Sequence, residues 1–167
     1  MRVRSFCLYL FIISLQLACN DNKLLQHKMV GIYLMKSYQL VPGKCLLDKN
    51  AFVLQDTPFV KNGEILKYSV STHEYTITRG CQEKFRSLPP RTPLAITVNN
   101  QVIFTAFNVP GYISSTCDNS IVLTPSDSTP TIRVNLGYPG INNEPGIDDQ
   151  RNNVKLVAAL AEQGKLH

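Results

Sequence analysis

Short runs rich in Val, Ile, Thr, Tyr and Phe, separated by turn residues, dominate the chain from residue 29 onward and constrain its fold most. Runs of about four to eight such residues are typical of strands. They lie at 30–41, 45–47, 52–54, 65–71, 74–78, 94–98, 101–107, 113–117, 120–124 and 131–136. The pattern predicts an all-β domain. Because the frequent prolines would interrupt the strands of a closed barrel, we expect a small antiparallel β-sandwich.

Local signals predict one hairpin turn, one long loop and one helix. Asn99-Asn100 separates two strand-like runs and predicts a two-residue hairpin turn. The segment 88–93 contains three prolines, which remove ladder donors, so it is not expected to be a central strand. Residues 137–153 carry few apolar side chains and are expected to form a long loop. After this loop a helical stripe, with Gly164 as its C-cap, predicts one short C-terminal helix; the stripe consists of Val154, Leu156, Val157 and Leu160.

The N-terminus has the organisation of a secretory signal peptide. Basic residues at 1–4 precede an apolar run from Phe6 to Ala18, and the chain becomes polar after Cys19. A membrane-spanning helix needs about 20 apolar residues, which this run lacks. We therefore expect residues 1–18 to be removed, residues 19–28 to form a tether, and residues 29–167 to fold as a single β-rich domain.

The segment Leu15-Gln16-Leu17-Ala18-Cys19 resembles the cleavage motif of bacterial lipoproteins. The resemblance implies that Cys19 is lipidated and becomes the mature N-terminus, which would anchor the protein to a bacterial membrane in the periplasm. Asn20 replaces the acidic residue that retains many such proteins at the inner membrane, so the outer membrane is favoured. Cleavage by ordinary signal peptidase is the alternative, although Gln16 suits neither enzyme well.

Three cysteines remain if Cys19 carries lipid. In an oxidising compartment they would form one disulfide and leave one thiol. Their spacing of 36 residues is too wide for a zinc knuckle or a CxxC motif. Because Cys45 and Cys81 each follow a glycine-containing turn at an expected strand start, we predict a Cys45–Cys81 bridge and a free Cys117 thiol. If Cys19 is not lipidated, four cysteines could form two bridges.

Catalytic chemistry finds little support in the residues. His73 is the one histidine outside the tether and the last position, and His73-Glu74 is not followed by the second histidine of an HExxH site. No GxSxG motif, phosphate loop or dinucleotide fingerprint occurs. The acidic segment 142–149 lacks the alternating ligands of a calcium loop. We expect no enzymatic activity, no cofactor and no metal site.

The net charge does not predict a nucleic-acid partner; it is compatible with an acidic protein partner or an anionic membrane surface, and solvated surface charge is the simpler interpretation. The net charge is +5 for the whole chain and +3 once Arg2 and Arg4 leave with the signal peptide, which is too mild for a nucleic-acid-binding domain. Lys84, Arg86 and Arg91 flank the rigid Pro89-Pro90 turn. We predict that these three residues contact an acidic protein surface, with simple solvation as the alternative.

Two short segments carry a further resemblance. Val41-Pro42-Gly43-Lys44-Cys45 and Tyr68-Ser69-Val70-Ser71 resemble parts of small enterobacterial lipoproteins thought to be immunity proteins of type VI secretion systems. This resemblance implies stoichiometric neutralisation of a toxin or effector delivered to the periplasm, and it assigns no individual functional residue. The alternative is a structural or assembly lipoprotein of an envelope, pilus or secretion complex.

Overall fold

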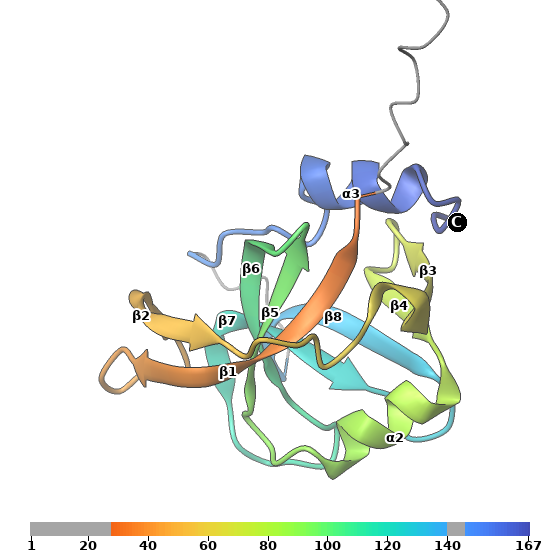
Figure 1. Ribbon diagram of the computed structural model, residues 1–167. Coiled ribbons are helices and arrows are strands. Elements are labelled where there is room, and N and C mark those ends of the chain that lie inside the picture. The colour runs from red at the N-terminus through yellow and green to blue at the C-terminus, as the bar shows by residue number, and fades with distance from the viewer. Residues whose placement is uncertain (1–27, 140–145) are drawn as a thin grey trace, which may run out of the picture.

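The computed structural model describes residues 28–139 and 146–167. The expected signal peptide, Cys19 and most of the tether lie outside these residues. Within them the chain forms eight strands, a 3-10 turn (η1) and two α-helices (Figure 1). In chain order these are β1 (Val30–Leu40), β2 (Leu47–Leu54), η1 (Asn62–Glu64), β3 (Ile65–Ser69), β4 (Glu74–Ile77), α2 (Arg79–Ser87), β5 (Pro93–Val98), β6 (Gln101–Asn108), β7 (Cys117–Pro125), β8 (Thr131–Tyr138) and α3 (Val154–Ala161).

All eight strands belong to one sheet in the order β2-β1-β5-β6-β7-β8-β4-β3. Neighbours are antiparallel except β6 and β7, which pair in parallel over residues 106–108 and 121–123. The prediction of a mostly β domain with a C-terminal helix is confirmed. A sandwich is not confirmed, and the expectation of purely antiparallel strands is wrong, because the connection 109–116 returns the chain to the end of the sheet at which β6 began.

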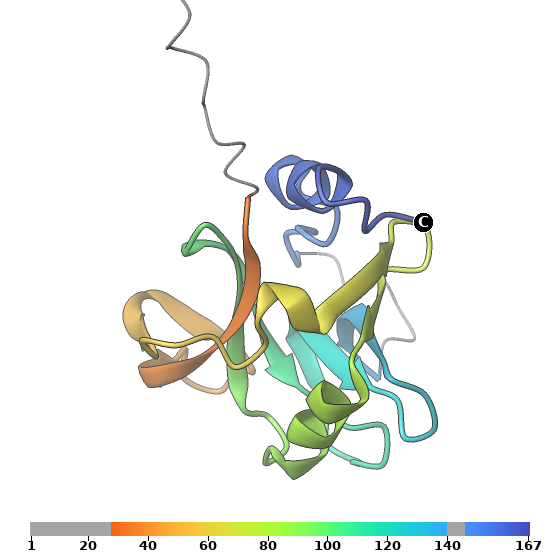
Figure 2. The same ribbon diagram turned by 45° about the vertical axis from the view of Figure 1, so that its right-hand side comes forward.

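The sheet curls around a main hydrophobic core, and the two helices lie at opposite ends of it (Figures 1 and 2). From α3, Leu156 and Leu160 are fully buried in this core, whereas Val154 of the expected stripe is exposed. The sheet does not close. β1 and the segment leading to β3 are joined by a single bridge, in which Ile32 and Val60 exchange backbone hydrogen bonds of 3.1 and 3.0 Å.

Helix α2 is absent from the sequence-based prediction, which placed a strand start at Cys81. The Thr78 side chain accepts a hydrogen bond from the Cys81 backbone N–H at 3.3 Å and caps the helix. Cys81 and Phe85 are buried one turn apart on its inner face. In the sequence Gly80 suggests the end of a regular element. In the structure it lies in the first turn of α2, where a glycine does not break the helix.

The far half of β1 and the whole of β2 extend from the body as a two-stranded arm, which we define as residues 36–54 (Figure 1). β1 pairs with β5 only from Val30 to Leu34, and its remaining residues pair with β2. A smaller hydrophobic cluster supports the base of the arm on the sheet face away from the main core. Its buried members are Met35, Leu47, Ala95, Phe107, Val109, Cys117 and Val122.

Candidate functional site

The cysteine pairing differs from the prediction. Cys45 bonds Cys117, with the two Cα atoms 5.2 Å apart, and Cys81 is a buried free thiol. The predicted Cys45–Cys81 bridge is therefore wrong. The physical reason is α2, which holds Cys81 in the main core, while Cys45 and Cys117 lie at the smaller cluster. Burial raises the pKa of the Cys81 thiol to about 12, so that it stays protonated and unreactive at neutral pH.

The three predicted contact residues do not form one cluster. Lys84 donates to Glu64 at 2.6 Å, and Arg86 of the same helix donates to the Asp127 carbonyl. Arg91, beyond the helix, donates to the Thr116 carbonyl at 2.5 Å. Each cation is thus held by a different part of its own chain. Their role in binding a partner stays a prediction. Arg91 lines a surface hollow.

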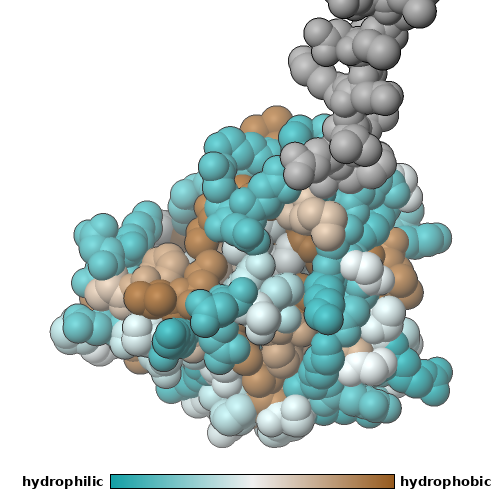
Figure 3. Space-filling model, in the orientation of Figure 1, coloured by the Kyte–Doolittle hydropathy of each residue, from teal (hydrophilic) through white to brown (hydrophobic). Residues whose placement is uncertain are grey.

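That hollow lies beside the turn that joins β1 to β2 and has a volume of about 380 Å³. Tyr38 and Leu40, two residues apart on β1, point to the same face and are 46% and 47% exposed. Apolar side chains gather over the arm at the left of Figure 3. The complete lining of this "arm hollow" is Tyr38, Leu40, Val41, Pro42, Gly43, Lys44, Cys45, Arg91, Phe107, Thr116 and Asp118.

The arm hollow is built on a rigid base. The Cys45–Cys117 disulfide ties the turn between β1 and β2 to the start of β7. Arg91 has a positive φ of 63°, and its backbone N–H donates to the Asn108 carbonyl at 2.6 Å. Because two segments distant in sequence hold these side chains, little conformational entropy remains to be lost when a partner binds.

The charge of the arm hollow favours an acidic partner. Lys44 and Arg91 contribute two cations to its lining, and Asp118 contributes one anion. The arm itself adds the exposed Lys36 and Lys49 and the partly exposed Asp48, so cations remain in excess. The arm hollow thus presents exposed apolar groups bordered by cations. A complementary partner surface would carry an apolar side chain surrounded by carboxylates.

His73 lies far from this hollow in the turn between β3 and β4, where its φ is 53°. Its Nδ1 atom is 3.5 Å from the Tyr68 hydroxyl, which donates to the Arg151 carbonyl at 2.9 Å. Burial lowers the pKa of His73, and the charge of Arg151 lowers it further. Together with the bond from Tyr68 to Asn152 Oδ1 at 3.0 Å, these contacts hold residues 151 and 152 against β3.

Within residues 28–139 and 146–167, no group of three or more His, Cys, Asp or Glu side chains could hold a metal ion. None of the helices in the described part of the chain is long and apolar enough to cross a membrane. One feature of the sequence, the length of a strand-like run, could have indicated the arm hollow. The apolar run at 30–41 is longer than the mean strand of about five to six residues, and its excess length forms the arm.

Comparisons with protein-family models, with curated proteins and with solved structures found no match to this chain.

Proposed function

We propose that this chain is a periplasmic binding protein that neutralises a toxin or effector by forming a stoichiometric complex through the arm hollow. The observation that carries the proposal is the exposed pair Tyr38 and Leu40, adjacent on one face and bordered by Arg91. Exposing large apolar side chains to water costs free energy, so apolar side chains that gather on a rigid surface mark interaction sites.

A membrane anchor at Cys19 is the second part of the proposal. It is supported by the apolar run that ends in Ala18-Cys19 and by the disulfide-forming geometry of Cys45 and Cys117, which suits an oxidising compartment. Cys19→Ser is expected to abolish acyl labelling and to leave the precursor uncleaved. Membrane retention of this variant without acyl label would contradict the anchor while leaving the binding function standing.

The function is tested by co-expression with the products of neighbouring genes, each exported to the periplasm of a bacterial host. One of these products is expected to be toxic alone and harmless with this chain, and the two proteins should elute together at a 1:1 ratio in size-exclusion chromatography with light scattering. Tyr38→Glu and Leu40→Glu should each abolish protection, because a charge would be buried at the centre of the interface. Arg91→Glu should weaken it mainly through the association rate.

Val53→Glu is the matched control. Val53 is 54% exposed on β2 and pairs with Ser37, so its side chain lies on the opposite face of the arm from Tyr38. This variant should protect as well as the natural protein, and all variants should keep their thermal midpoints. If no neighbouring product is toxic and the chain instead copurifies with envelope or pilus components, it is an assembly protein and the neutralising function is overturned.

A further inference from the structure

A second hollow, of about 560 Å³, lies on the face of β4, β7 and β8 that points away from the main core. Its volume is within the range of small-molecule sites. Ile132 and Val134 of β8 are buried in the main core, so Arg133 between them points to the opposite face. We call this site the sheet hollow.

The strand register brings polar side chains from all three strands into one row. Arg133 is the Cα partner of Glu74 on β4 and of Thr124 on β7. Directly paired residues of antiparallel strands share a face, with their Cβ atoms about 4.5–5.5 Å apart. Asn135 lies two residues after Arg133 on β8 and therefore shares this face. The four side chains converge on the floor of the sheet hollow, and all four line it.

The hydrogen-bonding capacity of this row is only partly used. Arg133 Nη2 is 3.6 Å from Glu74 Oε2, which is longer than a hydrogen bond, and neither side chain makes another polar contact within the described residues. The Asn135 NH2 group donates to the Thr124 hydroxyl oxygen at 3.2 Å. This bond leaves the Asn135 Oδ1 acceptor and the Thr124 O–H donor without a partner in the same part of the chain. The row thus offers donors and acceptors side by side.

Both ends of the sheet hollow are held in place. At one end, Gln82 of α2 is 5% exposed and donates to the carbonyls of Ser126 and Thr129 at 2.8 and 2.7 Å, which fixes the turn between β7 and β8. At the other end, the Tyr138 hydroxyl donates to the Ile113 carbonyl at 3.0 Å. Because these walls are already ordered, little conformational entropy remains to be lost when a ligand binds.

Tyr138 reaches the sheet hollow because Gly137 interrupts the alternation of β8. Gly137 has a positive φ of 75°. Strict alternation would place Tyr138 on the same face as Val134, but its side chain packs against the smaller cluster on the other face. The Tyr138 ring thus gives the sheet hollow an aromatic wall beside the polar row.

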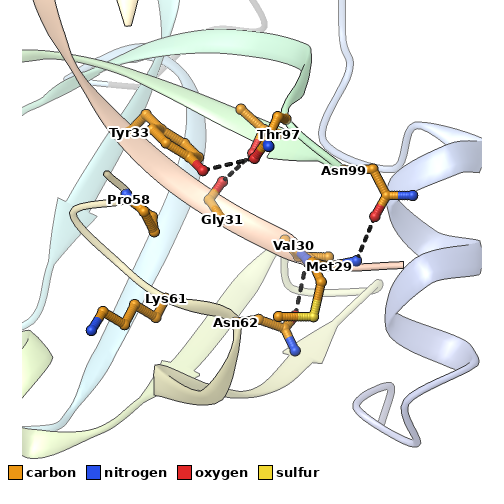
Figure 4. Close-up of a pocket in the computed structure, with 10 residues that line it drawn as sticks. Met29, Val30, Gly31, Tyr33, Pro58, Lys61, Asn62, Thr97 and Asn99 are labelled. Carbon is orange, nitrogen blue, oxygen red and sulfur yellow. Dashed lines mark hydrogen bonds between the residues drawn. The ribbon is translucent and has the colours of Figure 1, made fainter. Parts of the chain in front are cut away.

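A hollow of about 570 Å³ beside the start of β1 differs, because its polar side chains bind the backbone of the chain itself (Figure 4). Asn99 Oδ1 accepts from the Met29 backbone N–H at 2.8 Å. Asn62 Oδ1 accepts from the Val30 backbone N–H at 2.9 Å. These bonds fix the start of β1, and we assign no ligand to that hollow.

We propose that the sheet hollow binds an uncharged saccharide. Each sugar hydroxyl both donates and accepts, so adjacent hydroxyls bridge the Glu74 carboxylate and the Arg133 guanidinium. A further hydroxyl bonds Thr124 and Asn135, and the apolar C–H face of the sugar ring packs on Tyr138. Of the described residues that line the hollow, Glu74 is the one anion and Arg133 the one cation, so no net charge selects an ionic ligand.

The sheet hollow shares no lining residue with the arm hollow. Its saccharide ligand is therefore distinct from the protein partner proposed for the arm hollow, and either site can be present without the other.

The test uses the protein purified after export from a bacterial host, titrated with maltose, cellobiose and N,N′-diacetylchitobiose while backbone amide NMR signals are recorded. At least one disaccharide should shift the signals of residues 74–76, 124–131 and 133–138. Cyclohexanol, a ring with a single hydroxyl, should bind at least about tenfold more weakly, since it cannot bond the whole row. No shift by any disaccharide at millimolar concentration, or equal binding of cyclohexanol, would overturn the proposal.

Variants locate the binding. Glu74→Gln should weaken disaccharide binding about tenfold, because a charge-assisted hydrogen bond is lost, and Thr124→Val should weaken it about fivefold. Both replacements keep the approximate volume of the side chain. Glu83→Gln is the matched control, because Glu83 is exposed on α2 outside the lining and loses the same charge. With thermal midpoints unchanged, an equal loss in the control, or no loss in the other two variants, would refute the site.

The source of the saccharide is distinguished by sedimentation with purified bacterial cell-wall sacculi. Cosedimentation that Glu74→Gln weakens would assign a glycan of the envelope. Binding of the soluble disaccharides alone would assign a dissolved sugar. Either result supports the site, and the absence of both contradicts it.

Discussion

The two edges of the sheet differ in how the chain protects them. At the β3 edge, the Tyr68 N–H donates to the Lys165 carbonyl at 2.7 Å and the His167 N–H donates to the Tyr68 carbonyl at 3.2 Å, so the residues after α3 cover the strand. At the β2 edge, no strand of the described chain pairs with the outer side of β2. There the register shift between Tyr38 and Leu40 makes residues 48–51 bulge, and Lys49 is exposed within the bulge.

This difference separates stability from recognition. The β3 edge belongs to the main core, and its backbone groups are satisfied by the chain itself. The β2 edge rests on a small cluster and a disulfide, and it leaves Tyr38 and Leu40 in solvent. An edge strand with unpaired backbone groups can pair with strands of other molecules. The bulge and Lys49 hinder such non-specific pairing at the β2 edge, while the apolar face of the arm stays accessible.

The largest expected effect compares one tyrosine from each edge. Tyr68 is fully buried, and its hydroxyl donates within the fold, so Tyr68→Ala should lower the free energy of unfolding by about 3–5 kcal/mol. Tyr38→Ala should change it by less than about 1 kcal/mol, because nearly half of the Tyr38 surface is exposed in the folded state. Urea denaturation measures both. If the two variants lost equal free energy of unfolding, the arm would be part of the core and the two edges would not differ in this way.

The disulfide gives the next effect. Its two cysteines are separated by 72 residues, and removing such a link should cost about 2–4 kcal/mol because the unfolded chain gains freedom. Cys45→Ala with Cys117→Ala should therefore lower the urea midpoint and also speed hydrogen exchange in β2 more than in β3. Uniform exchange changes in both strands would contradict a local role for the bridge in the arm.

Removal of residues 165–167 tests the covered edge. The deletion uncovers the Tyr68 backbone groups and should cost about 2–3 kcal/mol, since four hydrogen bonds are lost: two with Tyr68 and those of Lys165 with Leu160 and Asn62. The exposed strand should also make the protein associate at high concentration, which light scattering detects. A deletion variant that stays monomeric at full stability would show that this edge needs no cover.

The smallest effect depends on pH. Arg151 donates to Asp149 through Nε and Nη2, both at 2.8 Å, and these bonds lower the pKa of Asp149 below its usual 3.8. The folded state therefore binds the proton less readily than the unfolded state, so the stabilisation is complete above pH 3.8 and is lost as pH falls through the lower folded value. Because Asp149 is partly exposed, Asp149→Asn should cost under about 1 kcal/mol at pH 7 and less as the pH falls below 3.8 toward pH 2. A cost that is unchanged between these pH values would assign the effect to packing.

Sequence signals that act over a few residues were sufficient to predict the β-rich fold class and two local features of the fold. The Asn99-Asn100 turn has positive φ at both residues, and a short helix forms near the C-terminus. The C-cap of that helix is Glu162 and not the expected Gly164, which follows two residues later with a φ of 65°. These conformations depend on the residue itself, since asparagine and glycine tolerate positive φ at little cost. The candidate site was predicted only through Arg91, which lines the arm hollow; Tyr38 and Leu40 were part of a strand-like run with no sign of exposure.

The tertiary structure decided everything that depends on which distant segments meet. An alternating strand pattern is the same whichever neighbour the strand selects, so neither the parallel β6–β7 pair nor the single sheet follows from it. The cysteine pairing required the position of Cys81, and that position depends on α2 packing Phe85 into the main core. Local propensity is a residue's own property, whereas pairing, burial and exposure come from contacts between residues far apart in the chain, and only the folded chain brings those residues together.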